Sequence, residues 1–393
     1  MLILASLLAL SWMLQLVLAL RVRASVPTVA SLPPPARDAW PRVSIVVPAR
    51  DEALHVEEAL RSKLACGYPA LEVVAVDDRS RDATGAIFDR VAAEDARVKA
   101  VHLRELPAGW LGKLNAMAQG AAQASGAWIL FSDADVHVEP GTLERLVAWA
   151  EAERIDFIGV FPRMRPATLA VDAALACLLR VLALAGRGWR ANRDEGGVGL
   201  GVGAFNLVRR ATLERTDALR VLRMEVIDDV ALGALVKQSG ARCRFLAGRA
   251  WVHLEFLSDL AAVGRSADKG GGVMGFSWWR PPLVAAVPLV LDVVLPVVAL
   301  TRGGVTAMLG AAALALATLT HLAITDHFDG PRRGPLLWPL GTLLTSALTL
   351  RAGLTAWRRQ GVSWRETFYA RETLERGRRF DLATMRVRTG VDG

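Results

Sequence analysis

The chain has 393 residues, of which 53% are hydrophobic, and its 47 basic and 39 acidic residues leave a net charge of +8. This composition is far from that of a disordered chain, and the gathering of apolar residues at both ends argues against a purely water-soluble globule. Only five of the basic residues are Lys, an Arg bias typical of genome composition, so we expect no nucleic-acid partner. A basic chain with apolar ends more often meets an anionic bilayer surface.

The three cysteines lie far apart and form no CxxC pair, at Cys66, Cys177 and Cys243. They indicate neither a disulfide framework nor a zinc site. The central part of the chain is therefore predicted to be cytosolic and reduced.

An uncharged apolar segment opens the chain at residues 1–20. It is long enough for one helical crossing of a bilayer core of about 30 Å. Arg21 and Arg23 follow at once, the reverse of the charge order of a signal peptide. We predict an uncleaved N-terminal transmembrane anchor whose C-terminal end lies in the cytoplasm. The proline-rich stretch that ends the next segment predicts a linker over residues 21–41.

Three more apolar runs of bilayer length follow near the other end, at residues 281–300, 305–324 and 336–357. They predict C-terminal membrane helices within residues 281–357. Three crossings from the cytoplasm would place the tail outside, yet this basic tail, residues 358–393, holds nine Arg against five acids, which favours the cytoplasm. The first run contains Asp292, so it is either a re-entrant or surface-lying element or the site of a functional intramembrane acid. Two or three spans stay open.

Residues 42–255 alternate short β-branched runs with helical stretches, which predicts an α/β fold with a Rossmann-like, mostly parallel sheet and helices on both faces. The predicted strands are residues 43–47, 71–76, 98–103, 127–132 and 156–161, and the predicted helices are residues 52–64, 82–93 and 114–124. Ligands of such sheets bind outside the carboxyl ends of the strands. Polar clusters that follow strands are therefore the candidate site residues.

The first cluster, Arg50, Asp51 and Glu52, follows the strand that ends in VVP. Its acids could equally be helix N-terminal residues that offset the macrodipole. The second cluster, Asp77 and Asp78, ends a buried strand. Two adjacent acids are more than the capping of the next helix needs, and a carboxylate here could accept the imide hydrogen of a uracil ring.

The third cluster is Asp133 and Asp135, in the segment FSDADV. In an extended chain these carboxylates point to the same side and repel one another unless a cation lies between them. Mg²⁺ or Mn²⁺ is typically held by one or two carboxylates plus substrate phosphate oxygens. The alternative is a solvated turn that caps the helix near Thr142.

The fourth cluster is Asp228 and Asp229, which open an amphipathic helix. Asp228 alone would satisfy the N-cap. Asp229, one residue further in, would face the space over the sheet edge. A carboxylate there could take a proton from an attacking hydroxyl.

Together VSIVVPARDE, VVAVDDRSRDATG, FSDADV and IDDVALGALVKQSG resemble glycosyltransferase family 2, in that family's order and at similar separations. The resemblance covers about residues 42–240. It implies a GT-A fold for a catalytic domain over residues 42–255, a nucleotide-sugar donor, a divalent metal ion (Mg²⁺ or Mn²⁺) and inversion of the anomeric centre.

The resemblance also implies roles for single residues. Positions that contact the donor nucleotide are matched by Pro48, Arg50, Glu52, Val76 and Asp78. In the acid-x-acid element, Asp135 would reach the metal, while Asp133 would lie near the sugar or ribose and beside the metal. Asp229 matches the general base, and Asp228 stands where this family usually has Glu.

The segment GWLGK resembles the GWxGK stretch of membrane-bound members that glycosylate lipids, including hopanoid-associated, carotenoid and ceramide glycosyltransferases. Its Lys113 is suited to neutralising a diphosphate as a point charge, with a solvated helix-start lysine as the alternative. The tail piece GVSWRETFYARETL resembles the WRGRxY element of such enzymes but departs from it at Glu366 and Thr367.

Processive members of the family carry a Gln-x-x-Arg-Trp element after the base helix, and this chain has LSDLAAVGRSADKGGG instead. We therefore predict transfer of a single sugar. Arg265 and Lys269 of this stretch would meet either phosphates or lipid headgroups, which makes residues 256–280 an interfacial segment. The glycine-rich stretch Gly196 to Asn206 either approaches the donor or acceptor through its backbone or is a flexible loop.

The sequence thus predicts an integral protein of the bacterial inner membrane, with its catalytic domain in the cytoplasm. Its partners would be a nucleotide-sugar donor, a membrane lipid acceptor and the bilayer. The rival functions are a polyprenyl-phosphate glycosyltransferase, a polysaccharide synthase or exporter, and a membrane scaffold. Neither the sugar nor the acceptor lipid is identified by the sequence.

Overall fold

The computed structural model describes residues 1–36, 38–255, 259–364 and 367–389. Its contacts divide the chain into two compact units. The helical unit comprises Met1–Ser25, Met164–Trp189 and Glu255–Glu375, and the sheet unit comprises Val26–Arg163, Arg190–Leu254 and Arg376–Gly393. The segment predicted as one continuous catalytic domain, residues 42–255, therefore gives up an internal apolar stretch to the helical unit, and the end of the basic tail joins the sheet unit.

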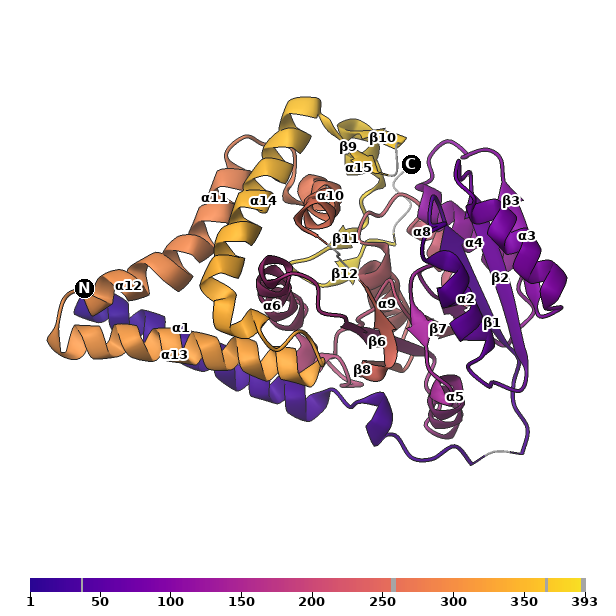
Figure 1. Ribbon diagram of the computed structural model, residues 1–393, viewed down its shortest axis with the longest axis horizontal. Coiled ribbons are helices and arrows are strands. Elements are labelled where there is room, and N and C mark those ends of the chain that lie inside the picture. Colours follow the sequence, from indigo (N-terminus) through magenta and orange to yellow (C-terminus); the bar gives the residue numbers. More distant parts are fainter. Residues whose placement is uncertain (37, 256–258, 365–366, 390–393) are drawn as a thin grey trace. The chain divides into compact units, whose positions relative to one another are not determined.

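The sheet unit is built on eight strands in the order β3-β2-β1-β4-β7-β6-β8-β5 (Figure 1). Its first half is parallel, since β2 pairs with both β1 and β3, and β1 also pairs with β4. These strands are β1 (Val43–Ala49), β2 (Leu71–Asp78), β3 (Val98–Leu103) and β4 (Trp128–Phe131). All four were predicted, because their runs of β-branched and apolar residues are buried in the sheet.

The second half of the sheet makes it mixed rather than mostly parallel. Strand β7 runs antiparallel to both β4 and β6, and β5 runs antiparallel to β8. These strands are β5 (His137–Val138), β6 (Phe157–Met164), β7 (Asn206–Arg209) and β8 (Cys243–Leu254). Only β6 was predicted. Strands β5 and β7 are too short for a periodic pattern to identify them.

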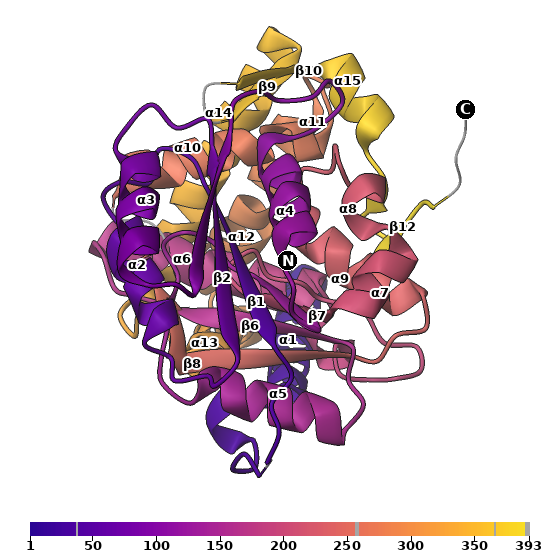
Figure 2. The same cartoon turned by 90° about the vertical axis from the view of Figure 1, so that its right-hand side faces the viewer.

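Helices cover both faces of the parallel half, as predicted. Figure 2 shows α2 and α3 on one side of β1 and β2, and α4 on the other. Right-handed crossovers require this, because the chain steps from β1 to β3 in one direction and from β3 to β4 in the other. The helices of the sheet unit are α2 (Val56–Leu64), α3 (Thr84–Glu94), α4 (Gly112–Gln123), α5 (Thr142–Ala152), α7 (Arg210–Thr216), α8 (Ala218–Val221) and α9 (Asp228–Gln238).

The predicted linker, residues 21–41, is partly structured. Helix α1 (Leu2–Ser25) runs through its first residues, and Thr28 then forms a parallel bridge with Ala247 of β8. A short 3-10 helix, η1 (Val29–Ser31), follows, with a capping box between Thr28 and Ser31. The segment that follows α1 is thus fastened to the sheet.

The helical unit contains every apolar run that was predicted as a membrane helix. Its helices are α1, α6 (Leu169–Ala185), α10 (Leu260–Gly270), α11 (Arg280–Pro288), the π-helical η4 (Leu289–Val294), α12 (Leu295–Leu300), α13 (Gly304–His327), η5 (Gly334–Leu337) and α14 (Trp338–Arg359). It also contains the hairpin of β9 (Gly361–Trp364) and β10 (Thr367–Ala370), whereas α15 (Arg371–Gly377) begins in it and ends in the sheet unit. Of the compared tail element, Glu366 lies outside the described residues.

Four helices among the described residues are long and apolar enough to cross a membrane: Leu2–Ser25, Leu169–Arg190, Arg280–Leu300 and Gly304–His327. Three of them were predicted. The second was missed because Asp172 and Arg180 interrupt its apolar pattern inside a segment assigned to the catalytic domain. The run at residues 336–357 forms α14, which is not among the four and carries Arg351 within it.

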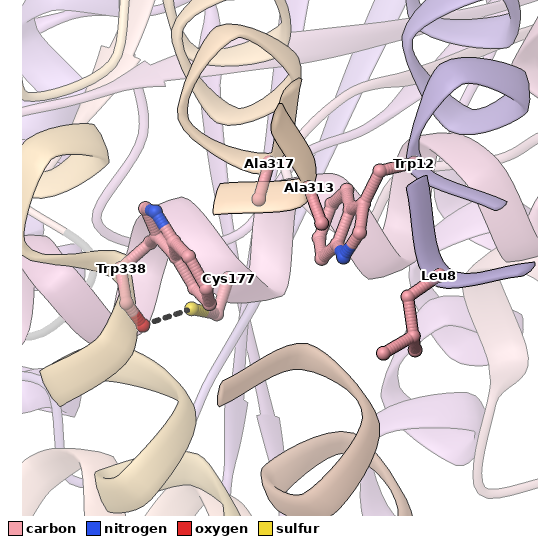
Figure 3. Close-up of a cluster of buried hydrophobic side chains, with 6 residues drawn as sticks. All are labelled: Leu8, Trp12, Cys177, Ala313, Ala317 and Trp338. Carbon is pink, nitrogen blue, oxygen red and sulfur yellow. Dashed lines mark hydrogen bonds between the residues drawn. The ribbon is translucent and has the colours of Figure 1, made fainter. Parts of the chain in front are cut away.

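Small and large side chains interlock at the centre of the helical unit (Figure 3). Trp12 of α1 packs between the first turn of α14 and Ala313 and Ala317 of α13, and its ring lies 5.8 Å from that of Trp338. Alanine in α13 allows the indole to approach the helix closely. The indole nitrogen of Trp338 donates to Thr318 over 3.0 Å, so its polar atom is satisfied within the apolar unit.

The acid that interrupts the first C-terminal run is neutralised by a cation from another helix. Asp292 in η4 accepts from Nη2 of Arg180 in α6 over 2.9 Å, and Nη1 of the same arginine donates to Gln15 over 2.7 Å. The guanidinium also lies 4.9 Å from the ring of Trp12. A paired and hydrogen-bonded charge is the form in which ions are tolerated in apolar surroundings.

Candidate active site

The first two predicted clusters lie side by side because strands β1 and β2 are parallel neighbours. Their register aligns Pro48 with Val76 and Ala49 with Asp77. Asp51 and Arg79, just beyond the two strands, both adopt left-handed backbone angles, with φ of 55° and 61°. Non-glycine residues rarely do so, and such strain is concentrated at functional sites.

Several hydrogen bonds tie the loop after β1 to the loop after β2. The amide of Asp51 donates to Ser80 over 3.1 Å, and one oxygen of Asp51 accepts from the amide of Arg81 over 2.8 Å. Asp82 accepts from the amides of Ala53 and Thr84, each over 2.9 Å. Asp51 and Asp82 therefore have structural uses, as their capping alternatives required.

Asp78 is buried at the end of β2 and paired with its neighbour. Its two carboxylate oxygens accept from Nε and Nη2 of Arg79 over 2.8 and 3.0 Å. Gly112 of the GWLGK segment lies against this pair, since a Cβ atom there would come within 2.5 Å of Oδ2 of Asp78. The loop after β2 and the start of α4 thus meet closely enough that only glycine fits.

Lys113, the next residue of α4, is surrounded by acids. Its Nζ atom lies 2.6 Å from Oδ1 of Asp133 and 3.8 Å from Oδ2 of Asp228. Burial lowers the pKa of Lys113, but the carboxylates of Asp133 and Asp228 outweigh burial and raise the pKa above its ordinary value. This lysine therefore carries a positive charge at neutral pH.

Gly203 is the point at which three candidate residues meet. Its amide donates to Oδ2 of Asp229 over 2.9 Å. A Cβ atom at this position would lie 3.1 Å from Oδ2 of Asp133, 3.2 Å from Nζ of Lys113 and 3.4 Å from Oδ2 of Asp229. The end of β4, the start of α4 and the start of α9 thus bring an acid, a cation and a second acid around one glycine.

The glycine-rich stretch is an ordered segment packed on α9. A Cβ atom at Gly201 would fall 1.9 Å from the carbonyl oxygen of Asp229, and one at Gly199 would fall 1.9 Å from that of Gly233. The amide of Val202 also donates to the buried Asn206 over 2.8 Å. The close backbone approach that the sequence suggested is therefore made to α9, and it holds Gly203 beside Asp229.

Asp135 lies in a second acidic group next to Asp133. Burial raises the pKa of Asp135 to about 6, and the charges of Asp133 and Glu52 add to this effect. The first and third predicted clusters are thus electrostatically coupled. Carboxylates held this way are poorly neutralised by their own surroundings.

Lys63 of α2 is a buried cation beneath this group that the sequence analysis did not single out. Its side chain is fully buried, and Nζ donates to the carbonyl of Val136 and to that of Ala59. Burial lowers the pKa of Lys63 to about 8, against the opposing effect of Asp135 and Asp133. It is one of only five lysines in the chain, which was the available signal.

The remaining predicted donor residues line the strand ends. The side chain of Val76 is fully buried, so only its backbone can reach a ligand. Arg50 lies over Asp51, with 3.8 Å between Nε and Oδ2. None of the contacts reported for Arg50, Pro48 or Val76 joins them to the group around Gly203 within the described part of the chain.

The donor atoms at this edge of the sheet suit a hard divalent cation. Asp133, Asp135 and Glu52 supply carboxylate oxygens, the ligands that Mg²⁺ and Mn²⁺ prefer. Among the described residues no group of three or more His, Cys, Asp or Glu side chains could hold a metal ion by itself. The residues thus fit a metal shared with substrate phosphates rather than a closed protein cage.

Residues 44–214 match the family described as Glycosyl transferase family 2. They form a glycosyltransferase domain. The match begins in β1 and ends in α7, so it includes the Asp78, Lys113 and Asp133 positions and Gly203, while Asp229 lies beyond it.

Two relatives and one solved structure resemble the chain. The succinoglycan biosynthesis protein ExoO of Rhizobium meliloti (strain 1021) is 40% identical over 119 residues, which are 30% of this chain and 32% of ExoO. The undecaprenyl-phosphate 4-deoxy-4-formamido-L-arabinose transferase of Shewanella sediminis (strain HAW-EB3) is 35% identical over 127 residues, 31% of this chain and 37% of that protein. Each match spans about a third of the relative's length.

The mannosyltransferase PcManGT from Pyrobaculum calidifontis, solved in complex with GDP-Man and Mn²⁺, aligns with 91% of this chain and 98% of its own, at a TM-score of 0.51 and 19% identity. This likeness concerns the fold, and it confirms the predicted GT-A class for the glycosyltransferase domain.

Proposed function

We propose that the protein transfers a single sugar from a nucleotide-diphosphate sugar, with UDP-sugars as the first choice, to a hydroxyl group of a membrane lipid, with inversion of the anomeric centre. The observation that supports this most is the meeting of Lys113, Asp133 and Asp229 around Gly203. A cation for a leaving diphosphate and a carboxylate for an acceptor proton lie there within reach of one substrate.

In this proposal the donor lies across the carboxyl ends of β1, β2 and β4. Asp78 and Arg79 present a carboxylate and a guanidinium beside Gly112, where a nucleotide base or ribose can form hydrogen bonds. Lys113 faces the diphosphate and neutralises the negative charge that gathers there as the sugar leaves. Asp133 orients Lys113 through their ion pair.

Asp135 and Asp133 would hold Mg²⁺ or Mn²⁺ together with the donor phosphates. When bound, this ion would supply charge stabilisation for the departing diphosphate. Glu52 and Lys63 would set the local charge around Asp135, one with and one against the acids.

Asp229 acts as the general base. The amide of Gly203 holds one carboxylate oxygen and the amide of Val230 holds the other, over 2.9 and 2.8 Å. As the acceptor oxygen attacks the anomeric carbon, its proton passes to this carboxylate, and the bond from that carbon to the diphosphate oxygen breaks. One displacement from the opposite face inverts the configuration.

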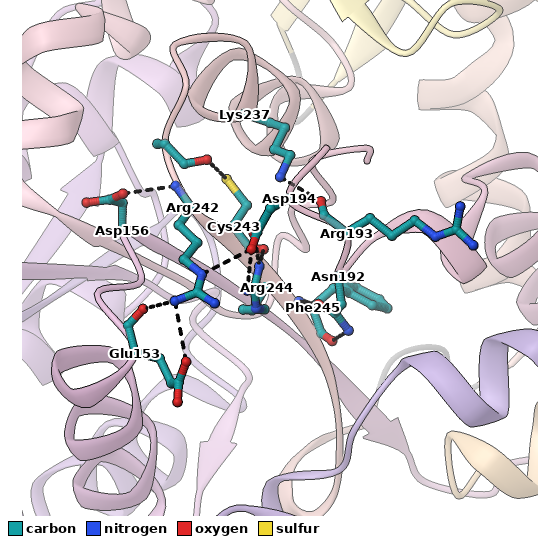
Figure 4. Close-up of polar contacts among 11 residues, drawn as sticks. Glu153, Asp156, Asn192, Arg193, Asp194, Lys237, Arg242, Cys243, Arg244 and Phe245 are labelled. Carbon is teal, nitrogen blue, oxygen red and sulfur yellow. Dashed lines mark hydrogen bonds and ion pairs between the residues drawn. The ribbon is translucent and has the colours of Figure 1, made fainter. Parts of the chain in front are cut away.

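The membrane part of the proposal limits how the chain crosses the bilayer. Helix α6 connects β6 to β7, which are paired neighbours in one sheet. The segment after α6 is also fastened to the sheet unit, since Asn192 exchanges two hydrogen bonds with Phe245, and Asp194 pairs with Arg244 (Figure 4). A chain that leaves and rejoins one sheet cannot cross the bilayer once, so α6 enters from and returns to the same side.

The same reasoning applies to the C-terminal helices. Strand β8 belongs to the sheet, and Val387 of the tail exchanges hydrogen bonds with Gln238 of α9. The chain between them therefore crosses an even number of times. Arg280–Leu300 and Gly304–His327 are the two candidates in this stretch, and we infer that they form a two-span hairpin.

The packing of α13 against α1 supports this topology. Trp12 lies beside His321 and Arg23 pairs with Asp326 over 2.7 Å, so the two helices run in the same direction. The C-terminal end of α1 leads directly into the sheet unit. Helix α13 therefore returns to the side on which the sheet lies, and the basic tail lies there too, in the cytoplasm on the positive-inside rule.

The acceptor in this proposal is a hopanoid, a carotenoid or another glycolipid precursor with an interfacial hydroxyl. A second candidate is a polyprenyl phosphate, which the name of the Shewanella relative favours. An acceptor that is already anionic needs no strong base. The paired hydrogen bonds that fix Asp229 favour a neutral hydroxyl instead.

Membranes that contain the protein should be incubated with labelled UDP-sugars and GDP-sugars and then extracted for lipid. We expect labelled lipid with one donor, and no labelled lipid with the Asp229→Asn variant. Label that mild acid releases would indicate a sugar phosphate of a polyprenyl lipid. Water-soluble polymer would indicate a synthase or exporter, and no label with any donor would overturn the proposal.

A further inference from the structure

The basic tail returns to the sheet unit after the whole helical unit has been completed. Its last described residues form a small antiparallel hairpin of β11 (Phe380–Asp381) and β12 (Arg386–Val387), called here the tail hairpin. Phe380, Met385 and Val387 are buried, with 3 to 5% exposure. A segment that buries its apolar side chains in this way is part of the folded unit rather than a solvated extension.

One end of the tail hairpin is held by a buried carboxylate just before α9. Glu225 is 3% exposed, and its Oε2 atom accepts from the amides of Arg379 and Phe380, each over 2.8 Å. A buried charge is costly unless it is hydrogen-bonded, and two successive backbone amides are a suitable anion site. Glu225 stands three residues before Asp228, where α9 begins.

The other strand of the tail hairpin is held at the far end of α9. Gln238, the last residue of this helix, donates through Nε2 to the carbonyl of Val387 over 3.2 Å and accepts from its amide over 2.7 Å. The tail hairpin thus contacts both ends of the helix that carries Asp229.

The packing at the first end is tight. A Cβ atom at Gly377, where the tail enters the sheet unit, would fall 2.3 Å from the Cβ atom of Met224. On another side of α9, Gly199 and Gly201 lie against its backbone. The helix is therefore fixed at its two ends by the tail hairpin and along its side by the glycine-rich stretch.

We propose that the tail hairpin is a clamp that positions α9, and with it the carboxylate of Asp229, and that Glu225 is the positioning residue that holds the clamp. The inference rests on the proposed function insofar as Asp229 is the base. A displacement of about 1 Å at a reacting group lowers turnover by about 100-fold. The clamp therefore makes transfer depend on residues that follow the last membrane helix.

The test compares Arg379→Pro with Arg379→Ala in the full-length protein. Both variants lose the arginine side chain, but only proline removes the amide that donates to Glu225. We expect hydrogen exchange of the α9 amides to rise at least tenfold in Arg379→Pro relative to Arg379→Ala. Unchanged α9 exchange in the proline variant would overturn the clamp whatever the activity of the protein.

The kinetic readout separates positioning from general stability. Lys113 and Asp133 lie outside α9, so we expect the affinity for UDP with Mn²⁺, with GDP measured beside it, to stay within twofold while kcat falls about tenfold or more. Glu225→Gln, which keeps an acceptor oxygen, should recover part of the kcat that Glu225→Ala loses, and these variants serve if the proline protein does not fold.

Equal losses of nucleotide affinity, kcat and thermal stability in these variants would assign the tail a purely structural role and overturn the inference. If α9 exchange rises as expected but the wild-type protein transfers no sugar from any donor, the clamp stands and the proposed function falls. The two hypotheses are therefore distinguished by exchange on one side and turnover on the other.

Discussion

The ammonium group of Lys113 lies 2.6 Å from a carboxylate oxygen of Asp133, and Asp228 is the next acid, at 3.8 Å. The lysine comes from the first turn of α4 and Asp133 from the loop after β4, so the pair joins two of the segments that the sequence analysis singled out. The ion pair keeps the lysine charged and directed to the place where a diphosphate would bind.

Removal of this charge should impair transfer. We expect Lys113→Met to lower kcat/KM by about 100-fold, because a preorganised cation next to a leaving group typically contributes on that order. The rate is measured as labelled lipid formed per minute. Lys99→Met is the matched control, since Lys99 is an exposed lysine of β3 that bonds to Gln123, and an equal loss in both variants would contradict the assignment.

Gly203 should tolerate no side chain. In Gly203→Ala the new methyl would lie 3.1 to 3.4 Å from Asp133, Lys113 and Asp229, so one or more of these groups must shift. We expect turnover to fall about tenfold, since small misplacements at a reacting centre are costly, with little change in thermal stability. Gly270→Ala, at a position with open space around it, should retain full activity. Full activity of Gly203→Ala would show that the three groups do not act together.

Cysteine labelling tests the proposed topology. The three native cysteines are buried, and burial raises the pKa of Cys66 and raises that of Cys243 to about 12, so background labelling should be low. In sealed inverted vesicles, an impermeant maleimide should label Leu382→Cys in the tail but should label Arg302→Cys, between α12 and α13, only after detergent is added. Labelling of both positions without detergent would mean that the hairpin does not cross.

His102 should make stability depend on pH. Its ring lies 2.8 Å from Asp89 and 3.2 Å from Asp77, and these acids raise the pKa of His102 above its usual 6.5. The charged imidazole therefore stabilises the fold fully below pH 6.5, and this contribution is lost as the pH rises through the folded-state pKa. The melting temperature of wild type relative to His102→Gln should be highest below pH 6.5 and should converge with it at alkaline pH. A difference that grows with pH would have the wrong sign.

Much of the sheet and part of the site could be predicted because the signals are local. Buried β-branched runs identify β1 to β4, and the acids that follow them mark the edge where Asp78 and Asp133 lie. Helix α6 could not be assigned, because its apolar pattern contains Arg180, whose partner Asp292 is 112 residues away. Glu225 and Lys63 were missed for a similar reason, since their partners are backbone groups of distant segments.

The pairing of Asp78 with Arg79 also escaped prediction. The left-handed backbone at Arg79 turns its side chain back onto the preceding carboxylate, and no residue pattern reports such an angle. The same applies to the glycine-rich stretch, whose packing on α9 depends on a fold-level contact between Gly199 and Gly233. Local patterns thus identify which residues reach the sheet edge, while tertiary contacts decide what each one touches.

The central claim is that Asp229 removes the acceptor proton during sugar transfer. The most direct test is a single-turnover measurement with the Asp229→Asn variant, with UDP affinity in the presence of Mn²⁺ determined in parallel. The account predicts nucleotide affinity within about twofold of wild type and a transfer rate lowered by at least 100-fold, in the range of a lost general base. Transfer at a near wild-type rate would contradict it.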